Sequence, residues 1–458
     1  MGGRAVPFLA RHGLVRRPIT DVGMRMKETR RPEVSQEPTT TARNLHLAVC
    51  QTELMARVVE QARVSREGDR LLGSFDARIR DDVLHITGFT PSHDSSPGAV
   101  GTTLQCPLYL AANPERELTA HVPVFATYDP THQDQVRFWL SDFQTGQATT
   151  LQLTTFSPAG DLFARVDSIF ETQMLSHKLV TVIGVGSGGS LLSIELARCG
   201  VRRFCLIDFD RLEPHNVARH ACAVSDIGRF KTRAVRDLLL DINPLAEVST
   251  HDFDILSESE EERLRSLIRS SDLVLACTDT ERSKYRINLI CLQESVPAIY
   301  AGAYERAFGG DVMRVDPGRD KPCYDCVVGT LQESFEDRPR GPIPYSSIAS
   351  LEEYKAEPGL GLDLHFIVLI QAKMALLTLL RGTDSRLEDL DHNYILWGNR
   401  KEWIFAHPFD CRMVTIRVRK DCPTHQLVFE NRDGLVRTTG RGPIPPLEHD
   451  GSLFKDLT

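Results

Sequence analysis

Polar side chains suited to nucleotide chemistry gather in the middle of the chain, directly after apolar segments. Asp208 and Asp210 follow one such segment, and Asp279 follows another, Leu273–Ala276. An amide and two cations stand between them, namely Asn216, Arg219 and Lys231. Carboxylates bind Mg²⁺, and cations neutralise phosphate charge. A hydride-transfer enzyme has no need of so many polar groups at strand ends, so this set favours transfer of a nucleotidyl group.

A glycine-rich turn precedes these residues. Gly184, Gly186 and Gly189 form G-x-G-x-x-G after the apolar segment Leu179–Val185. Such glycines allow a tight turn, close approach of a phosphate, and close packing of a helix on the sheet. The N–H groups at the start of that helix favour an anion. Alone, the pattern fits a dinucleotide-binding dehydrogenase equally well, and Asp208 stands near the distance of a ribose-binding acid.

Five segments together resemble the ThiF-like adenylating family. They are, in the family order, GVGSGGS, IDFDRLEPHNVARH, IGRFKTRAVRDLLLDINP, LVLACTDT and PCYDC. That family includes ubiquitin-activating enzymes and the adenylyltransferases of the sulfur-carrier and molybdopterin pathways. The resemblance covers about residues 165–425 and implies an α/β fold, a Rossmann-like adenylation domain with a mostly parallel sheet. It also implies ATP-dependent adenylation of the C-terminal glycine carboxylate of a ubiquitin-like or sulfur-carrier protein.

The same resemblance assigns roles to single residues. Asp208 is expected to hold the ribose of ATP, with Asp210 close by at the same strand end, and Asp279 to bind Mg²⁺. Asn216, Arg219 and Lys231 are expected to contact the phosphates. The protein need supply no nucleophile for this step, because its work is positioning and charge neutralisation. His220 stands where relatives commonly carry glutamine.

Two chelating pairs lie farther along the chain. Cys323 and Cys326 form C-x-x-C, and Cys422 and His425 form C-x-x-H after a predicted strand, Val414–Arg419. The first pair alone could also be redox-active or incidental. Relatives close a tetrahedral zinc site with an early and a late C-x-x-C. The resemblance therefore implies a structural Zn²⁺ site in which histidine is the fourth ligand, a known ligand set.

The position of a catalytic cysteine differs from that in ubiquitin-activating relatives, which carry one in the crossover between the two pairs. The interval Val327–Asp410 contains no cysteine. Cys411, after a proline-containing turn, is the nearest candidate, and Cys422 is the other if zinc does not bind it. Either the enzyme stops at the acyl-adenylate, which the empty interval favours, or one of these thiols forms a thioester. The other cysteines considered are expected to be buried and unreactive: Cys199, Cys205, Cys277 and Cys291.

The length of 458 residues predicts two folded units. Residues 1–44, rich in Arg, Pro and Thr, are expected to be disordered, and 431–458 form a tail. Residues 45–158 are predicted to form a smaller α/β accessory domain, for partner docking or as an inactive adenylation-like half. Residues 159–430 form the predicted adenylation domain with its zinc site. Within it, Asp337–Pro358 is predicted to be a crossover loop over the substrate's tail.

Composition restricts the partners. The net charge of −8 implies no nucleic-acid surface. No apolar run reaches the roughly 18–20 residues that span a bilayer, so the apolar segment beginning at Phe366 is predicted to be a core helix and no membrane is expected. Eleven cysteines without a secretory signal favour a reduced, cytoplasmic compartment.

The expected partners are a carrier protein ending in glycine, a second copy of the chain in a homodimer, and a conjugating enzyme if a thioester forms. Dimeric relatives carry an arginine that reaches the neighbouring subunit's nucleotide site. Ser168 stands at that place here, and Arg165 is the basic residue of the segment. Two alternatives remain: adenylation of a small peptide in secondary metabolism, and an inactive scaffold of the same fold.

Overall fold

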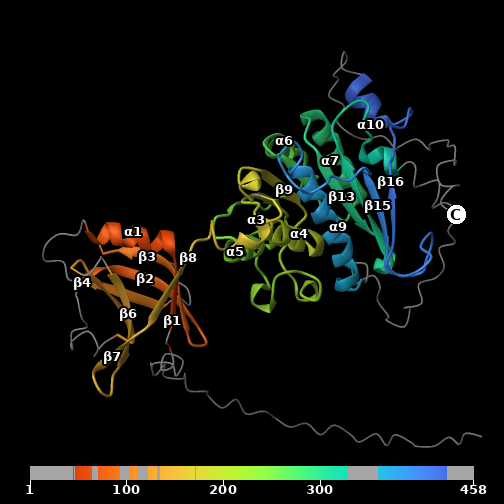
Figure 1. The fold of residues 1–458 in the computed structure, drawn as a ribbon. Helices are drawn as coiled ribbons and strands as arrows, with labels where there is room; N and C mark the ends of the chain where they lie inside the picture. Colours follow the sequence, from red (N-terminus) through yellow and green to blue (C-terminus); the bar gives the residue numbers. More distant parts are fainter. Residues whose placement is uncertain are drawn as a thin grey trace, which may run out of the picture. The chain divides into compact units, whose positions relative to one another are not determined.

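A computed structural model describes residues 45, 47–63, 71–92, 104–110, 122–131, 135–170, 172–328 and 359–430 (Figure 1). The chain divides into two compact units, Met1–Cys50 with Ala56–Thr154, and Gln51–Met55 with Thr155–Thr458. Three predictions fall outside the described residues: disorder in 1–44, the crossover loop Asp337–Pro358, and the tail 431–458.

The first unit is built on a mixed eight-stranded sheet in the order β7-β6-β5-β4-β2-β3-β1-β8. Helix α1 lies along this sheet and buries Leu54, Val58 and Ala62 (Figure 1). The bounds are β1 Leu47–Gln51, α1 Thr52–Arg63, β2 Leu71–Arg80, β3 Val83–Pro91, β4 Leu104–Leu110, β5 Val124–Asp129, β6 Gln135–Asp142, β7 Gln147–Thr150 and β8 Gln152–Phe156.

The apolar residues of Leu45–Val64 recur with a helical period, which predicts a single helix, and this prediction is wrong for Leu47–Gln51. Residues Leu47–Gln51 form strand β1, which pairs in parallel with β3. Ala48 and Cys50 are buried between partly exposed neighbours, so this short stretch has the two-residue period of a strand. Its apolar residues also match a helical period, because five residues are too few to separate the two.

The second unit is built on another eight-stranded sheet, in the order β11-β10-β9-β12-β13-β14-β15-β16. Strands β11 to β13 of that order pair in parallel, and β13 to β16 pair antiparallel. This is the α/β fold with a mostly parallel sheet that the sequence predicts. The bounds are β9 Leu179–Ile183, β10 Arg203–Ile207, β11 Glu247–His251, β12 Leu273–Ala276, β13 Ala298–Ala303, β14 Gly309–Val315, β15 Tyr394–Gly398 and β16 Asp410–Val414.

Helices cover both faces of this sheet. Val180 and Val182 of β9 belong to a core shared with α4, α5 and α9, whereas Ile183 belongs to a core shared with α6 and α7. A strand buried on both faces is largely apolar, as β9 is apart from Thr181. The bounds are α3 Ala164–Asp167, α4 Ser187–Arg198, α5 Lys231–Ile242, α6 Glu261–Arg269, α7 Glu281–Glu294, α9 Gly361–Leu379 and α10 Pro423–His425. Single turns are η2 Thr172–Leu175, η3 Pro214–Asn216, η4 Val224–Asp226, η5 Glu258–Glu260, η6 Glu305–Ala307 and η7 Gln426–Glu430.

Helix α9 is long and apolar enough, by length and composition, to cross a membrane. Half of its most apolar window is buried within the protein, and Met374 and Ala375 are fully buried. It packs against α4 and against strands β13 and β14. The core helix predicted from Phe366 onward is therefore confirmed as an element of the second unit.

The predicted strand Val414–Arg419 is placed too late in the sequence. Strand β16 spans Asp410–Val414 and pairs with β15 along its whole length. Beyond Val414, the backbone of Ile416 forms hydrogen bonds with a side chain instead of with a neighbouring strand. The side chain of Asn393 donates to the carbonyl of Ile416 and accepts its N–H. A side-chain contact from a distant residue ends the strand here, and the local sequence does not reveal it.

Candidate active site

A pocket of about 750 Å³ opens where β9, β10, β12 and β13 end. Carboxyl ends of parallel strands meet at one edge of a sheet, where ligands of such folds bind. The pocket is lined by eight of the nine nucleotide-binding residues predicted from the sequence: Gly184, Gly186, Asp208, Asp210, Asn216, Arg219, Lys231 and Asp279. The ninth, Gly189, lies buried in the first turn of α4.

Two positions of the glycine-rich turn have no room for a side chain. Gly184 has φ +88°, and a Cβ there would lie 2.7 Å from the carbonyl oxygen of Cys277. A Cβ at Gly189 would lie 2.0 Å from the carbonyl oxygen of Gly184. Gly186 has no atom within 4 Å of such a Cβ, so it leaves the start of α4 open to the pocket. An anion can approach the free N–H groups there.

Replacing Gly189 with alanine should destabilise the second unit by roughly 1–3 kcal/mol, because the new methyl group overlaps a backbone oxygen that cannot rotate away. The matched control is Gly188→Ala in the same helix, whose Cβ would meet Val368 Cγ2 at an ordinary 3.5 Å. Thermal unfolding of both variants checks this. Equal melting temperatures for the two variants would contradict the steric explanation.

Asp208 and Asp210 form the wall of the pocket after β10. Asp208 Oδ2 accepts the N–H of Val185 at 2.7 Å, and Oδ1 accepts the N–H of Asp210 at 2.8 Å. Burial raises the pKa of Asp208, against the attraction of Lys231. Each carboxylate oxygen has a further lone pair, so Asp208 can still accept a ribose hydroxyl.

The ammonium of Lys231 is held at this wall before any nucleotide binds. Lys231 begins α5, is largely buried, and donates from Nζ to Asp210 Oδ2 at 2.7 Å. An ammonium has three N–H donors, so two remain for phosphate oxygens. The second carboxylate after β10 therefore orients the lysine, which is a contact that the sequence did not reveal.

His220 is a structural residue of the site. Its Nε2 donates to the carbonyl of Val185 at 2.9 Å, and its Nδ1 accepts the N–H of Cys222 at 3.1 Å. This pattern requires the neutral ring, and burial lowers its pKa in agreement. His220 thus ties the segment that carries Arg219 to the glycine-rich turn, a role that a side-chain amide at this position could also fill.

The far end of the pocket is formed by residues that no sequence pattern identified. They come from the start of α7, from β13 and the following turn, and from α9: Glu281, Lys284, Gly302, Tyr304, Arg306 and Ile367. Arg306 and the next residue, Ala307, have positive φ values of 54° and 52°. The small residues at the end of β13 are the one local hint in the sequence, because they leave room beside a strand end.

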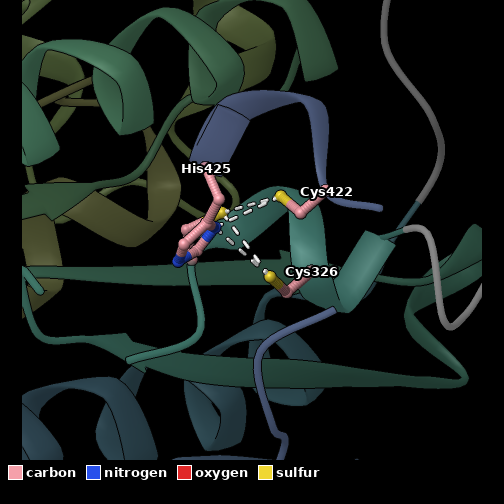
Figure 2. Close-up of side chains that lie close together, drawn as sticks. Cys326, Cys422 and His425 are labelled. Carbon is pink, nitrogen blue, oxygen red and sulfur yellow. Dashed lines mark hydrogen bonds between the residues drawn. The ribbon is translucent and has the colours of Figure 1, made fainter. Parts of the chain in front are cut away.

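The four predicted metal ligands come together (Figure 2). The sulfur of Cys323 lies 3.8 Å from that of Cys326 and 3.6 Å from that of Cys422. Nδ1 of His425 lies 3.3 Å from the sulfur of Cys422 and 3.7 Å from that of Cys326. Tetrahedral zinc with ordinary bond lengths requires about 3.8 Å between two sulfurs and about 3.5 Å between sulfur and nitrogen. The geometry fits zinc.

Surrounding groups orient these ligands for a metal. Nε2 of His425 donates to the carbonyl of Lys321 at 2.9 Å, which turns Nδ1 toward the sulfurs. The N–H of Arg419 lies 3.5 Å from the sulfur of Cys326. Hydrogen bonds from Cys323 and then Cys422 lower the pKa of Cys326, which favours the thiolate that zinc binds.

Cys411 lies apart from both sites. It lies in the edge strand β16, and it is exposed. Burial of its sulfur, and then Asp410, raise its pKa, so little thiolate is present at neutral pH. Cys422 is fully buried among the metal ligands.

Of the four cysteines predicted to be buried, two are buried and two are partly exposed. Cys205 and Cys291 are buried, whereas Cys199 and Cys277 are half-buried. Cys277 lines the pocket, and burial of its sulfur raises the pKa to about 12. A thiol with that pKa is a poor nucleophile at neutral pH.

Comparison with known proteins finds related sequences. A ubiquitin-like modifier-activating enzyme 5 from Caenorhabditis elegans is 30% identical over 170 residues, which are 36% of this chain and 40% of that protein. The enzyme of the same name from Culex quinquefasciatus is 31% identical over 171 residues, 36% of this chain and 43% of that protein. The matched part is thus less than half the length of these relatives.

Solved structures of Escherichia coli MccB are similar to part of the chain. The one determined with ATP has 17% sequence identity and a TM-score of 0.45, and the alignment covers 58% of this chain and 75% of that one. The profile of the ThiF family matches residues 152–412, which is more than half of the 458 residues. The protein belongs to the ThiF family.

Proposed function

We propose that this protein uses ATP to adenylate the C-terminal glycine carboxylate of a ubiquitin-like or sulfur-carrier protein. The observation that carries the proposal is the pocket, where residues from separate segments of the chain meet: the glycine-rich turn, Asp208, Arg219, Lys231 and Asp279. Family membership and the relatives named ubiquitin-like modifier-activating enzyme support the same reaction.

The pocket residues lie across the sheet in the same order as the ribose, the phosphates and the metal ion of a bound Mg–ATP. Asp208 follows β10, the glycine-rich turn follows β9, and Asp279 follows β12, and these strands are neighbours in that order. Asp208 binds the ribose, the start of α4 with Arg219 and Lys231 binds the phosphates, and Asp279 holds Mg²⁺. Bound Mg²⁺ would neutralise charge on the phosphates.

In the proposed reaction, one carboxylate oxygen of the terminal glycine forms a bond to the α-phosphorus. The bond from that phosphorus to the oxygen bridging to the β-phosphate breaks, and pyrophosphate leaves with its electron pair. The product is the acyl-adenylate. No side chain has to take a proton, so the chain contributes position and charge.

The test supplies the purified full chain with ATP, Mg²⁺, labelled pyrophosphate and a panel of ubiquitin-like and sulfur-carrier proteins that end in glycine. We expect pyrophosphate exchange into ATP with at least one carrier, and none when its terminal glycine is removed. Nucleotide binding without exchange for any carrier would favour the small-peptide alternative. Failure to bind ATP would favour the inactive scaffold.

We further propose that the product is the acyl-adenylate rather than an enzyme thioester. Cys411 has a raised pKa, and Cys422 is buried among the metal ligands. Incubation with ATP and the carrier panel, followed by a gel without reductant, should show no thiol-sensitive adduct. An adduct that disappears in Cys411→Ala or Cys422→Ala would contradict this proposal and identify the sulfur.

The accessory unit would dock the carrier or a conjugating enzyme, and two copies of the chain would form a dimer. The cytoplasm suits the protein because thiols such as those of the Cys–His cluster stay reduced there. Sedimentation of the purified chain checks the dimer.

A further inference from the structure

Lys284 lies in the first turn of α7, the helix that begins just after the proposed metal ligand Asp279. It lines the pocket, yet only 9% of its side chain is exposed. Asp279 lies on the short connection from β12 to α7, and Lys284 lies in α7 itself. A nearly buried cation therefore faces the pocket on the side away from Asp208 and Lys231.

The ammonium of Lys284 lacks a hydrogen-bond acceptor within the described part of the chain. Glu281 Oε1, 3.8 Å away, is too distant for a hydrogen bond and belongs to an exposed side chain. Burying a charge without hydrogen bonds is costly. The three N–H donors of Lys284 are consequently available to a ligand in the pocket.

Asp311 and Gly302 explain why the ammonium is placed there. Asp311 Oδ2 accepts the hydroxyl of Tyr394 at 2.7 Å. Burial raises the pKa of Asp311, against this hydrogen bond and the attraction of Lys284. A Cβ at Gly302 would lie 2.9 Å from Asp311 Oδ1 and 3.4 Å from Lys284 Nζ. The absence of a side chain at Gly302 thus leaves space directly beside Lys284 and Asp311.

The order of the strands identifies what this subsite would bind. Strand β13, which carries Gly302, is the next neighbour of β12 on the side away from β9 and β10. If the ribose lies at β10, the phosphates at β9 and the metal at β12, the group beyond them is the one that reacts with the α-phosphate. This step rests on the proposed function.

We propose that Lys284 binds the reacting carboxylate of the substrate and, after the transfer, the carbonyl oxygen of the acyl-adenylate. Carboxylate and α-phosphate are both anions and repel each other. An ammonium between Asp279 and Gly302 offsets that repulsion and fixes the direction of attack. Arg219 and Lys231 serve the phosphates, and Arg306, the other cation at this end of the pocket, is paired with Glu402 at 3.2 Å. Lys284 is therefore the cation assigned to the acyl group.

The experiment compares two ligands on the full chain by calorimetry, which avoids the need for an identified carrier. One is AMP, and the other is N-acetylglycyl sulfamoyladenosine, a stable mimic that adds the acyl carbonyl. The variant is Lys284→Met, which keeps the apolar stem. The matched control is Lys373→Met on α9, an exposed lysine outside the pocket lining.

We expect the mimic to bind the wild-type chain and Lys373→Met at least about tenfold more tightly than AMP does, as one hydrogen bond to a charged donor allows. Lys284→Met should lose that advantage while its affinity for AMP stays within about twofold. Gly302→Ala, which keeps the lysine but fills the space beside it, should show the same selective loss.

Equal loss of AMP and mimic in Lys284→Met would overturn the inference, because the lysine would then belong to the nucleotide subsite. An unchanged preference for the mimic in Lys284→Met or, if that variant does not fold, in Gly302→Ala would also overturn it. These results leave the proposed adenylation standing. Failure of the wild-type chain to bind either ligand would instead overturn both proposals.

Discussion

Asp279→Ala should lower carrier-dependent pyrophosphate exchange by about 10²–10³, the usual cost of removing one charge-stabilising group from an active site. Its carboxylate is exposed at the mouth of the pocket. Within the described residues it makes no hydrogen bond or ion pair, so its loss should leave the melting temperature unchanged. The measurement is exchange at saturating ATP with the carrier that proves active.

The matched control is Asp241→Ala, another exposed carboxylate of the second unit that does not line the pocket. It should exchange at the wild-type rate. The effect in Asp279→Ala should also shift with the metal, because a ligand-deficient site needs more Mg²⁺ for half-maximal exchange. Near-normal exchange in Asp279→Ala would remove this residue from the metal-binding role.

Cys323→Ser should cost the second unit its metal and much of its stability. Metal analysis of the wild-type chain should find about one zinc, because the four ligand atoms lie within 4.8 Å of one another and fit a tetrahedron. A structural zinc site contributes apparent binding energy on the order of 10 kcal/mol. The variant should therefore lose zinc and unfold at a markedly lower temperature.

Two comparisons separate metal loss from the loss of a buried sulfur. Cys291→Ser removes another fully buried sulfur and should lower stability while keeping the zinc, and Cys411→Ser should change neither. A strong chelator should lower the melting temperature of the wild-type chain but not that of Cys323→Ser. A stable, metal-free wild-type protein would contradict the zinc site.

Residues close together in the sequence were predicted well, because short-range preferences decide their conformation. The glycine-rich turn after β9 was predicted from its glycine spacing, and the positions of Asp208 and Asp279 from the apolar strands that precede them. Errors arose at Leu47–Gln51 and Val414–Arg419, where pairing with distant residues decides the state of the chain.

The sequence by itself therefore determined the chemistry that this protein can offer: a phosphate-binding turn, carboxylates after strands, and two chelating pairs. Only the tertiary structure decided which groups meet. The sulfurs of Cys323 and Cys422 are 99 residues apart in sequence and 3.6 Å apart in space. The role proposed for Lys284 depends on Gly302 and Asp311. The order of β12, β13 and β14 in the sheet places both residues beside it. Local preferences act over a few residues, whereas packing of the sheet and its helices brings distant segments together.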